Sequence, residues 1–563
     1  MKNTDYLQRS LHSVWHPCSQ MKQFETLPLI PIARGEGMWL YDFEGGRYLD
    51  AISSWWVNLF GHCNPRINAA LKDQLDRLEH VILAGFTHEP VIQLSERLST
   101  LTGLGHCFYG SDGASATEIA LKMSFHYWRN SGQPEKTRFI SLQNSYHGET
   151  IGALSVTDVA LFKDTYAPLL RQSTQVPTPD WRHAETGESP RDYAIRCAGH
   201  LRTHLEQHHA ETAAFIIEPL VQGAAGMGMY DAEYLRQARA ICDEFQVHLI
   251  ADEIAVGFGR TGTMFAFEQA NVPSSADTHA ETASPSRTRR SAPTESGDSV
   301  SCRTGTMFAF EQANVPSSAD THTETASPSR TRRSAPAESG DSVSCRTGTM
   351  FAFEQANVPS SADTHAETAS PSRTRRSAPA ESGDSASCRT GTMFACEQAG
   401  IRPDFMCLSK GISGGYLPLS AVLTTDTVFQ AFYHDETAKG FLHSHSYTGN
   451  ALACRAALAT LDIFEQDGVI EANRARAAYL TQAAQPLRDH PRVKNFRHTG
   501  MIWAFEVESG TPHFSRAFYQ QALQHELLLR PMGNTVYFMP PYIISEAEID
   551  LLIARTLKIV DCV

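Results

Sequence analysis

One lysine in this sequence stands between an apolar run and a glycine-rich turn. Lys410 follows the apolar residues 405–408 and precedes three glycines within five positions. Apolar surroundings disfavour the charged ammonium and lower the pKa of a lysine. A neutral lysine amine can attack a carbonyl and form a Schiff base. The same pattern also fits an exposed lysine at the end of a strand, so its chemistry depends on what the fold brings beside it.

Three more apolar runs are each followed by side chains that could take part in such chemistry. The runs are residues 139–142, 213–217 and 247–251, and they lead to Tyr146, Glu218 and Asp252. A helical segment precedes each run, which predicts an α/β fold with a mainly parallel sheet. Ligands bind at the carboxyl ends of parallel strands, so we expect these side chains at one rim of the sheet. Lys410 follows one further strand and can reach the same rim.

A fourth element predicts a site for an anion. Residues 107–123 read as a strand, a tight turn of small residues and a helix, with Gly113 and Ala114 at the start of the helix. The first turn of a helix offers free backbone N–H groups and a positive dipole end, which suit a phosphate. A simple capped turn has the same signature.

Two N-terminal stretches predict smaller elements of the fold. Residues 38–50 alternate around Gly45 and Gly46, which predicts a β-hairpin with its turn at the glycines. A helix is expected over 65–78 from its apolar stripe. Trp55 and Trp56 are expected on a strand, where they point to opposite faces. One can then fill a core while the other lines a pocket, or both can have a purely structural role.

The middle of the chain contains a tandem repeat with a period of 43 residues. The segment Arg-Thr-Gly-Thr-Met-Phe-Ala begins at Arg260, Arg303, Arg346 and Arg389. The tracts between the copies are rich in Ser, Thr, Pro and charge, and they cannot bury enough apolar surface to offset chain entropy. We therefore predict a disordered insert that loops out of a compact enzyme. A docking array for a partner is the alternative. Of the identical first and last copies, we favour the first as the one that packs in the core.

Composition excludes several functional classes. The net charge is −14 and the pI about 5.9, which disfavours binding to nucleic acid or to an anionic membrane surface. The N-terminus lacks the apolar core of a signal peptide, and no apolar run is long enough to span a membrane. The 12 cysteines are scattered without CxxC pairs, as in a reducing compartment. We expect a cytoplasmic protein without a metal site.

Residues 250–262, together with Leu408-Ser409-Lys410-Gly411, resemble the class III aminotransferases of PLP fold type I. Further segments resemble the branch of this family that works in biotin synthesis; they are residues 15–17, 53–56, 144–148 and 539–544. The resemblance implies a homodimer with shared active sites that uses pyridoxal 5'-phosphate. It also implies amino transfer to 8-amino-7-oxononanoate, giving 7,8-diaminononanoate, from S-adenosylmethionine or lysine. Another class III ω-aminotransferase, or a non-catalytic interaction protein on this fold, remains possible.

The resemblance also assigns roles to residues that would hold the cofactor. Lys410 would be the Schiff-base lysine and proton carrier, Asp252 would bind the pyridine nitrogen, and Tyr146 would stack on the ring. Gly113 and Ala114 would hold the phosphate through backbone N–H groups. His445 and Ser446 match the place where family members reach the cofactor phosphate of the partner subunit.

Substrate contacts are implied in the same way, for the residues Cys18, Trp55, Tyr146, Ser444, Arg530 and Tyr537. Arg530 would pair with a carboxylate, for which its two-pronged guanidinium is suited. Three departures from the family pattern bear on the substrates. Cys18 stands where a tyrosine is usual, and Glu149 stands where an aspartate is usual. The loop 445–448 resembles that of relatives that use lysine as the amino donor.

These observations predict a domain organisation with five segments. An N-terminal segment of 1–60 packs with the small domain. The large cofactor-binding domain is formed by 61–266 and 396–455, interrupted by the insert at 267–395, and the small C-terminal domain covers 456–563.

Overall fold

The computed structural model describes residues 2–27, 29–271 and 401–563. Its central sheet has seven strands in the order β4-β12-β11-β10-β7-β5-β6. The strands are β4 (His106–Gly110), β5 (Arg138–Leu142), β6 (Thr174–Val176), β7 (Thr212–Ile217), β10 (His248–Asp252), β11 (Phe405–Leu408) and β12 (Ser420–Thr424). β12 is antiparallel to both of its neighbours, β11 and β4, and all the other neighbouring pairs are parallel. The predicted mainly parallel sheet is confirmed.

Helices cover both faces of this sheet, so its central strands are buried throughout. The helices of this part are α3 (Pro65–Leu75), α4 (Glu89–Thr102), α5 (Gly113–Asn130), α6 (Ile151–Val156), α7 (Ala160–Lys163), α8 (Pro190–His208), α9 (Glu233–Glu244), α10 (Asp426–Gln430) and α11 (Ala451–Gln466). Successive strand residues alternate between two cores. Ile250 belongs to a cluster with Ile119 of α5, whereas Leu249 belongs to one with Leu235 of α9.

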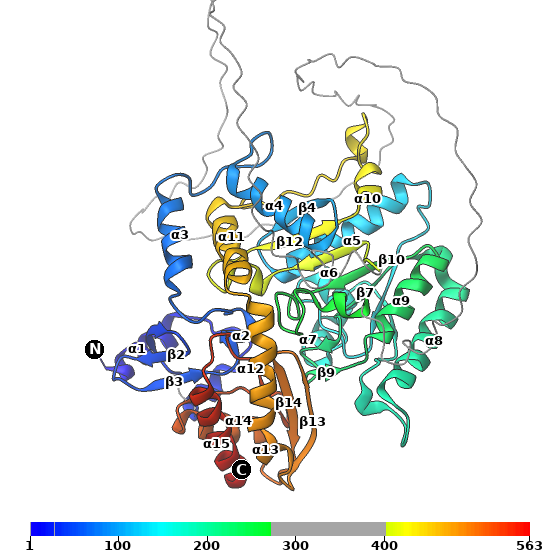
Figure 1. Ribbon diagram of the computed structural model, residues 1–563. Helices are drawn as coiled ribbons and strands as arrows, with labels where there is room; N and C mark the ends of the chain where they lie inside the picture. The colour runs from blue at the N-terminus through cyan, green and yellow to red at the C-terminus, as the bar shows by residue number, and fades with distance from the viewer. Residues whose placement is uncertain (1, 28, 272–400) are drawn as a thin grey trace, which may run out of the picture. The chain divides into compact units, whose positions relative to one another are not determined.

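The N-terminal and C-terminal ends of the chain share a second group of sheets (Figure 1). One sheet has the order β1-β2-β3-β15 and the other β13-β14-β16. Their strands are β1 (Ile32–Glu36), β2 (Trp39–Asp42), β3 (Arg47–Asp50), β13 (Val493–Thr499), β14 (Ile502–Val507), β15 (Leu527–Leu528) and β16 (Thr535–Phe538), and the helices beside them are α1 (Asn3–Ser13), α12 (Val469–Ala483), α13 (Gln485–Arg488), α14 (Phe514–Gln524) and α15 (Glu546–Cys562). The predicted hairpin is confirmed as β2 and β3. The domain boundary expected at 455/456 falls inside α11.

The helix expected over 65–78 is shorter than its apolar stripe suggested. Asn64 caps α3 by accepting from the N–H groups of Arg66 and Ile67, and the helix ends at Leu75. Leu75 is exposed, so its apolar side chain gives the last turn no packing.

The expectation that Trp55 and Trp56 lie on a strand is wrong. They belong to α2 (Ser53–Trp56), whose four residues have φ of +51°, +46°, +73° and +72°. The carboxylate of Asp50 fixes this left-handed turn by accepting from the N–H and the hydroxyl of Ser54 at 2.9 and 2.7 Å. As a result Trp56 is buried, while Trp55 keeps 45% of its surface exposed.

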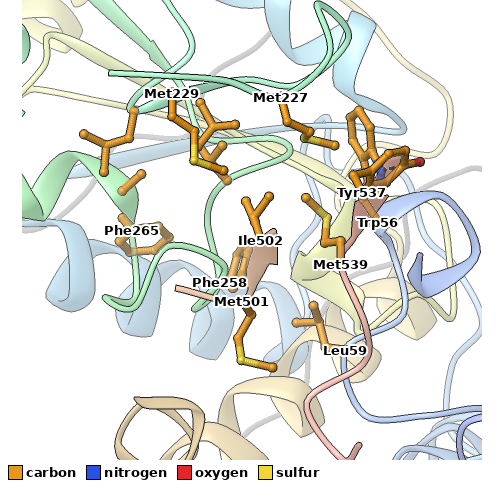
Figure 2. Close-up of a cluster of buried hydrophobic side chains, with 14 of the residues drawn as sticks. Trp56, Leu59, Met227, Met229, Phe258, Phe265, Met501, Ile502, Tyr537 and Met539 are labelled. Carbon is orange, nitrogen blue, oxygen red and sulfur yellow. Dashed lines mark hydrogen bonds between the residues drawn. The ribbon is translucent and has the colours of Figure 1, made fainter. Parts of the chain in front are cut away.

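The first copy of the repeated motif packs in the core. Phe258 and Phe265 lie in one apolar cluster with Met501 and Ile502 (Figure 2). The described structure then continues through the 3₁₀-helix η5 (Ala266–Asn271), in which Phe267 is buried. The insert therefore does not begin at 267. The carboxylate of Glu253 accepts from the N–H groups of Ala266 and Phe267 at 2.9 and 2.6 Å, which holds these residues in the fold. The other copies lie outside the described residues.

Within the described ranges, no helix is both long and apolar enough to cross a membrane.

Candidate active site

Side chains from several strand ends meet in a cavity of about 580 Å³. It is lined at the carboxyl ends of the parallel strands by Tyr146, Glu218 and Asp252, as the order of motifs predicted. Lys410 enters the same cavity from the short 3₁₀-helix η8 (Lys410–Ser413) that follows β11. Because β10 and β11 are parallel neighbours, Asp252 and Lys410 follow adjacent strands at the same sheet edge.

Lys410 lies in the apolar setting that its sequence suggested. Burial lowers the pKa of its ammonium, and the nearby carboxylates of Asp252 and Glu218 oppose that shift only in part. The Nζ lies 5.2 Å from the centre of the Trp56 ring. A buried amine with a lowered pKa is suited to act as a nucleophile and a base.

Asp252 is held by two hydrogen bonds at the floor of the cavity. The N–H of Ile254 donates to its Oδ1 at 3.1 Å, and the ring Nδ1–H of His147 donates to its Oδ2 at 2.7 Å. His147 is buried, and its Nε2 has no partner among the described residues. This pair presents a fixed carboxylate that can bind a protonated ring nitrogen.

Glu218 is a second buried acid beside the first. Burial raises its pKa to about 7, and the charge of Asp252 adds to this effect. Its two oxygens accept from the N–H groups of Tyr146 and Gly223 at 2.9 and 3.0 Å. Glu218 therefore joins the turn that carries Tyr146 to the turn that begins at Gly223.

The start of α5 forms the anion-binding side of the cavity. Gly113 and Ala114 line it, and Asp112 caps the helix by accepting from the N–H of Ser115. A Cβ on Gly113 would come within 2.9 Å of Ile254, so the close approach needs glycine. This 18-residue helix directs the free N–H groups of its first turn, and the positive end of its dipole, toward the cavity.

A second cavity of about 900 Å³ adjoins the first and shares Lys410, Tyr146 and Trp56 with it. Cys18, Trp55, Arg530 and Tyr537 line it. The guanidinium of Arg530 lies over the ring of Trp55 at 5.1 Å, and Trp56 Nε1 donates to the hydroxyl of Tyr537 at 3.2 Å. Aromatic walls with the guanidinium of Arg530 among them suit an aliphatic substrate that ends in a carboxylate.

Tyr146 stands between the two cavities. Its hydroxyl donates to Glu149 Oε1 at 2.9 Å, and burial, with this hydrogen bond, raises its pKa well above its usual value. Glu149, which departs from the usual aspartate of similar sequences, is long enough to make this contact.

Most of the residues singled out in the sequence come together, and three do not. Ser444 and Ser446 are exposed and line neither cavity of their own chain. His445 lines neither, but its Nε2 contacts the hydroxyl of Ser111, which lines the first cavity, at 3.0 Å. The polar loop 440–450 thus reaches the edge of the anion site through one side chain.

Sequence reasoning did not assign roles to two residues of the site, His147 and Trp56. His147 directly follows Tyr146 in the segment Tyr-His-Gly, and this position beside a predicted site residue was the available signal. Trp56 received no role of its own, because no sequence rule predicted the left-handed turn that aims it at Lys410.

The donor set fits pyridoxal phosphate. A buried lysine of lowered pKa, a hydrogen-bonded carboxylate and the start of a long helix surround one cavity, and these groups match the carbonyl, the ring nitrogen and the phosphate of that cofactor. Within the described ranges, no cluster of side chains could hold a metal ion.

Comparison with known proteins gives consistent results. The model of the family described as aminotransferase class-III matches residues 20–280 and 385–560. A relative from Helicobacter pylori, named adenosylmethionine-8-amino-7-oxononanoate aminotransferase, is 40% identical over 559 residues, which are 98% of this chain and 96% of the relative. A solved structure of the protein of that name from Methanocaldococcus jannaschii has a TM-score of 0.71 and 28% identity, and covers 99% of both chains. An omega transaminase from Pseudomonas jessenii, solved in complex with PMP, has a TM-score of 0.72 and 23% identity over 99% of this chain and 97% of its own, which is a likeness of fold.

Proposed function

The chain belongs to the class-III aminotransferases, which are PLP-dependent transaminases, and on that premise we propose that it aminates 8-amino-7-oxononanoate to 7,8-diaminononanoate in biotin synthesis. The observation that carries this proposal is that Lys410 and Asp252 line one cavity at the ends of adjacent parallel strands, in a chain that matches the Helicobacter pylori enzyme over nearly its whole length. The name of that relative supports S-adenosylmethionine as the amino donor.

The residues of the first cavity have distinct tasks in this reaction. Bound pyridoxal phosphate would supply a carbonyl for the amino group and an electron sink for the electrons left when the substrate carbon loses its proton. Lys410 Nζ would anchor the cofactor and, as a free amine, carry the proton between atoms of the substrate. Asp252, fixed by His147, would keep the ring nitrogen protonated, and Gly113 and Ala114 would bind the phosphate.

The residues of the second cavity would orient the substrates. Arg530 would bind the carboxylate of the keto acid, while Trp55 and Tyr537 contact its aliphatic chain. Cys18 leaves space and a thiol where a tyrosine would add a wall. Tyr146 lies at the junction and would separate the reacting carbon from solvent.

The working form is proposed to be a cytoplasmic homodimer with shared active sites. Ser444 and Ser446 are exposed in their own chain and line neither of its cavities, which leaves them free to serve a neighbouring one. The proposed role of Ser446 is to bind the phosphate of the partner subunit's cofactor. Mixed dimers of Lys410→Ala and Ser446→Ala chains would regain one intact site if this is correct.

One feature favours a second donor. The loop His445-Ser446-Tyr447-Thr448 resembles relatives that take the amino group from lysine. The test is an assay of diamine formation from 8-amino-7-oxononanoate, with S-adenosylmethionine and lysine as parallel donors and the Lys410→Ala protein as a blank. We expect product with S-adenosylmethionine. Product with lysine alone would reassign the donor, and amination only of other keto acids would overturn the proposal.

A further inference from the structure

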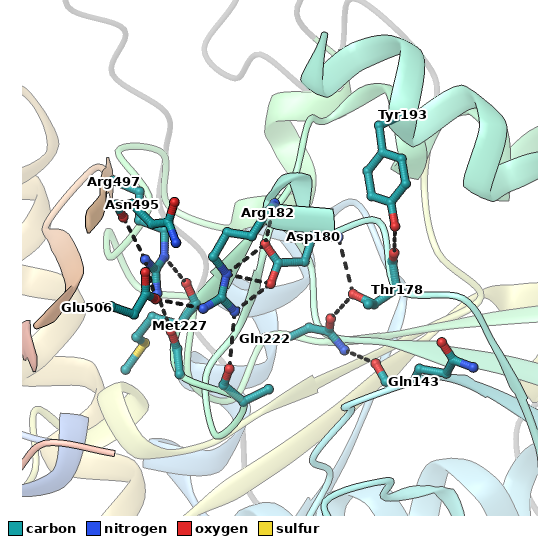
Figure 3. A network of polar contacts seen from close by, with 12 residues as sticks. Gln143, Thr178, Asp180, Arg182, Tyr193, Gln222, Met227, Asn495, Arg497 and Glu506 are labelled. Atoms are coloured by element: carbon teal, nitrogen blue, oxygen red, sulfur yellow. Dashed lines mark hydrogen bonds and ion pairs between the residues drawn. The ribbon is translucent and has the colours of Figure 1, made fainter. Parts of the chain in front are cut away.

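Two arginines from distant parts of the chain hold the backbone of one wall of the second cavity (Figure 3). We call residues 223–227 the wall loop; it joins β8 (Val221–Gln222) to β9 (Gly228–Met229), and its Ala224, Ala225 and Gly226 line the cavity. Arg497 Nε donates to the carbonyl of Met227 at 2.9 Å and its Nη2 to that of Gly226 at 2.5 Å. Arg182 Nη2 donates to the carbonyl of Ala225 at 3.3 Å. Three successive carbonyls of the wall loop are thus bound by guanidinium groups.

The arginines are themselves fixed by two acids. Arg182 Nε contacts both oxygens of Asp180, at 3.1 and 2.9 Å. Glu506 Oε1 accepts from Arg182 at 2.8 Å and from Arg497 at 2.9 Å. The side chain of Arg497 is 2% exposed and that of Glu506 11%. Buried ion pairs add little net stability compared with apolar packing, so a group of four charges points to a role in fixing geometry.

A β-bulge directs Arg497 to the wall loop. The pairing of β13 with β14 shifts register between Lys494 and Arg497, and Asn495 there has a φ of +50°. The carbonyl of Asn495 accepts from Arg497 Nη1 at 2.7 Å. Bulges re-aim side chains in this way, and a regular strand would not present Arg497 at the same angle.

The wall loop offers backbone and methyl groups to the cavity, so its position sets the width available to a substrate. Gly226 and Met227 have φ of +78° and +54°, a bent path that needs support. Gly223 packs on Trp56, where an added Cβ would come within 3.0 Å of the ring. Trp56 in turn contacts Lys410 and donates to Tyr537. A shift of the loop would therefore reach the catalytic lysine as well as the substrate wall.

We infer that Arg497 is a positioning residue that sets the width of the substrate cavity, with Arg182 and Glu506 as its supports. This inference rests on the proposed transaminase function, and it concerns discrimination between acceptors by the shape of their aliphatic chain. An unbranched keto acid fits a wall of glycine and alanine held at a fixed distance, whereas a branched one does not.

The test compares Arg497→Lys with Arg492→Lys in the full-length enzyme. Arg492 also donates to backbone carbonyls of its own region, those of Val560 and Glu508, and within the described part of the chain it has no hydrogen bond to the wall loop. For Arg497→Lys we expect the KM of the unbranched acceptor to rise about tenfold, the range for losing hydrogen bonds to a charged group, with a smaller change in kcat. The preference for unbranched over branched acceptors should fall. Hydrogen exchange over residues 220–230 should quicken, a readout that needs no turnover.

The Arg492→Lys control should leave the acceptor preference and the exchange of residues 220–230 unchanged. If Arg497→Lys does not fold, Glu506→Gln is the second variant. It should weaken the ion pairs that fix Arg182 and Arg497, and it should change the acceptor preference and the hydrogen exchange of residues 220–230 in the same direction. An Arg497→Lys enzyme with normal acceptor preference and normal exchange would overturn the inference. A wild-type enzyme that aminates no keto acid would instead overturn the proposed function, because the exchange result is independent of turnover.

Discussion

Burial acts on the charged groups of the active site in a common direction, toward their neutral forms. It lowers the pKa of Lys410 and raises that of Glu218 to about 7. Asp252 is bonded to a side chain, that of His147 at 2.7 Å, whereas Glu218 accepts from backbone N–H groups. One rim of the sheet thus holds three groups: the amine of Lys410, the carboxyl of Glu218 with a pKa near neutral pH, and the carboxylate of Asp252 bonded to His147. The surroundings of each group determine its chemistry more than its residue type does.

Replacing Asp252 with asparagine should weaken the electrostatic support of the cofactor ring. We expect kcat/KM to fall about 100- to 1000-fold, the scale of losing one preorganised partner in an active site. Turnover, cofactor affinity and unfolding temperature should be measured on the same samples, so that loss of binding and loss of fold are separated from loss of chemistry. Near-normal turnover with cofactor bound would show that another group supports the ring.

Glu218 should give the stability of the protein a distinct dependence on pH. Its usual pKa of 4.5 is raised to about 7 in the folded state, so folding favours its protonated form. Its contribution to stability is then present below pH 4.5 and is lost as pH rises to about 7, by roughly 3 kcal/mol. The free energy of unfolding, measured by denaturation at several pH values, should fall across this range for the wild type. It should not show this fall for Glu218→Gln. Parallel curves would contradict the shift.

Single residues of the site were predictable where a motif fixed their surroundings. Lys410 and Asp252 follow apolar strands, and parallel pairing alone brings them together. Trp56 was different, because its direction depends on the contact of Asp50 with Ser54, and a tryptophan pair gives no sign of four successive positive φ values. Ser444 and Ser446 were expected at a site, and one chain by itself cannot test a contact with its neighbour.

At the scale of elements, the segment 257–271 shows how one copy of a repeat becomes part of the core. Arg260 is fully buried and donates to the carbonyls of Pro540 and Asn58 at 2.9 and 3.2 Å. Its guanidinium also lies 4.9 Å from the ring of Tyr542. The motif therefore holds α2 and the strand end after β16 against the large sheet.

The identical motifs could not tell us which copy packs, but the residues before them could. Phe258 and Gly259 precede only the first copy, with φ of +54° and +87°, while Ser-Cys precedes the other three. Phe258 is buried at 1% exposure, so a serine there would leave a void. Gly259 accepts its conformation more readily than cysteine would. The preference for the first copy agrees with these contacts.

The repeat itself provides a matched test of this packing. Arg260→Met should leave buried carbonyls without a hydrogen-bond donor and lower the free energy of unfolding by about 3 kcal/mol. Arg303, Arg346 and Arg389 are followed by the same six residues, and the same substitution there should leave stability unchanged. Equal losses at Arg260 and Arg389 would mean that copies exchange in the core.

At the scale of the whole molecule, the repeat can be removed in two ways that differ by one core residue. Deleting 268–396 joins Phe267 to Glu397, and deleting 267–395 joins Ala266 to Cys396. Phe267 is 2% exposed, so the form that keeps it should be more stable by about 3 kcal/mol. Closing a long loop costs only roughly 0.6 kcal/mol per doubling of its length. The Phe267 form should therefore match the full chain in unfolding and turnover; folding with loss of activity would make the repeats part of the working enzyme.

The fold class was the most predictable property of the molecule, because strand–helix alternation survives the interruption at the repeat. Domain limits were less so. The limit drawn at 455/456 falls inside α11, whose alanine-rich sequence continues to Gln466 and packs on α3 and α4 throughout. The start of the insert was placed at 267 because the sequence does not show that Glu253 binds the N–H groups of Ala266 and Phe267.

The pairing of β10 with β11 has a consequence for engineering. These neighbours are joined in sequence by residues 253–404, which include the repeat, and Asp252 ends β10 whereas Lys410 follows β11. Two polypeptides divided within 272–400 would each hold half of the catalytic groups, and strand pairing such as that of β3 with β15 would draw them together. Expressed jointly, the halves should regain transaminase activity that neither has alone, and Lys410→Ala in the second half should abolish it. The enzyme could then serve as a split reporter, in which diamine output records the meeting of two fused proteins.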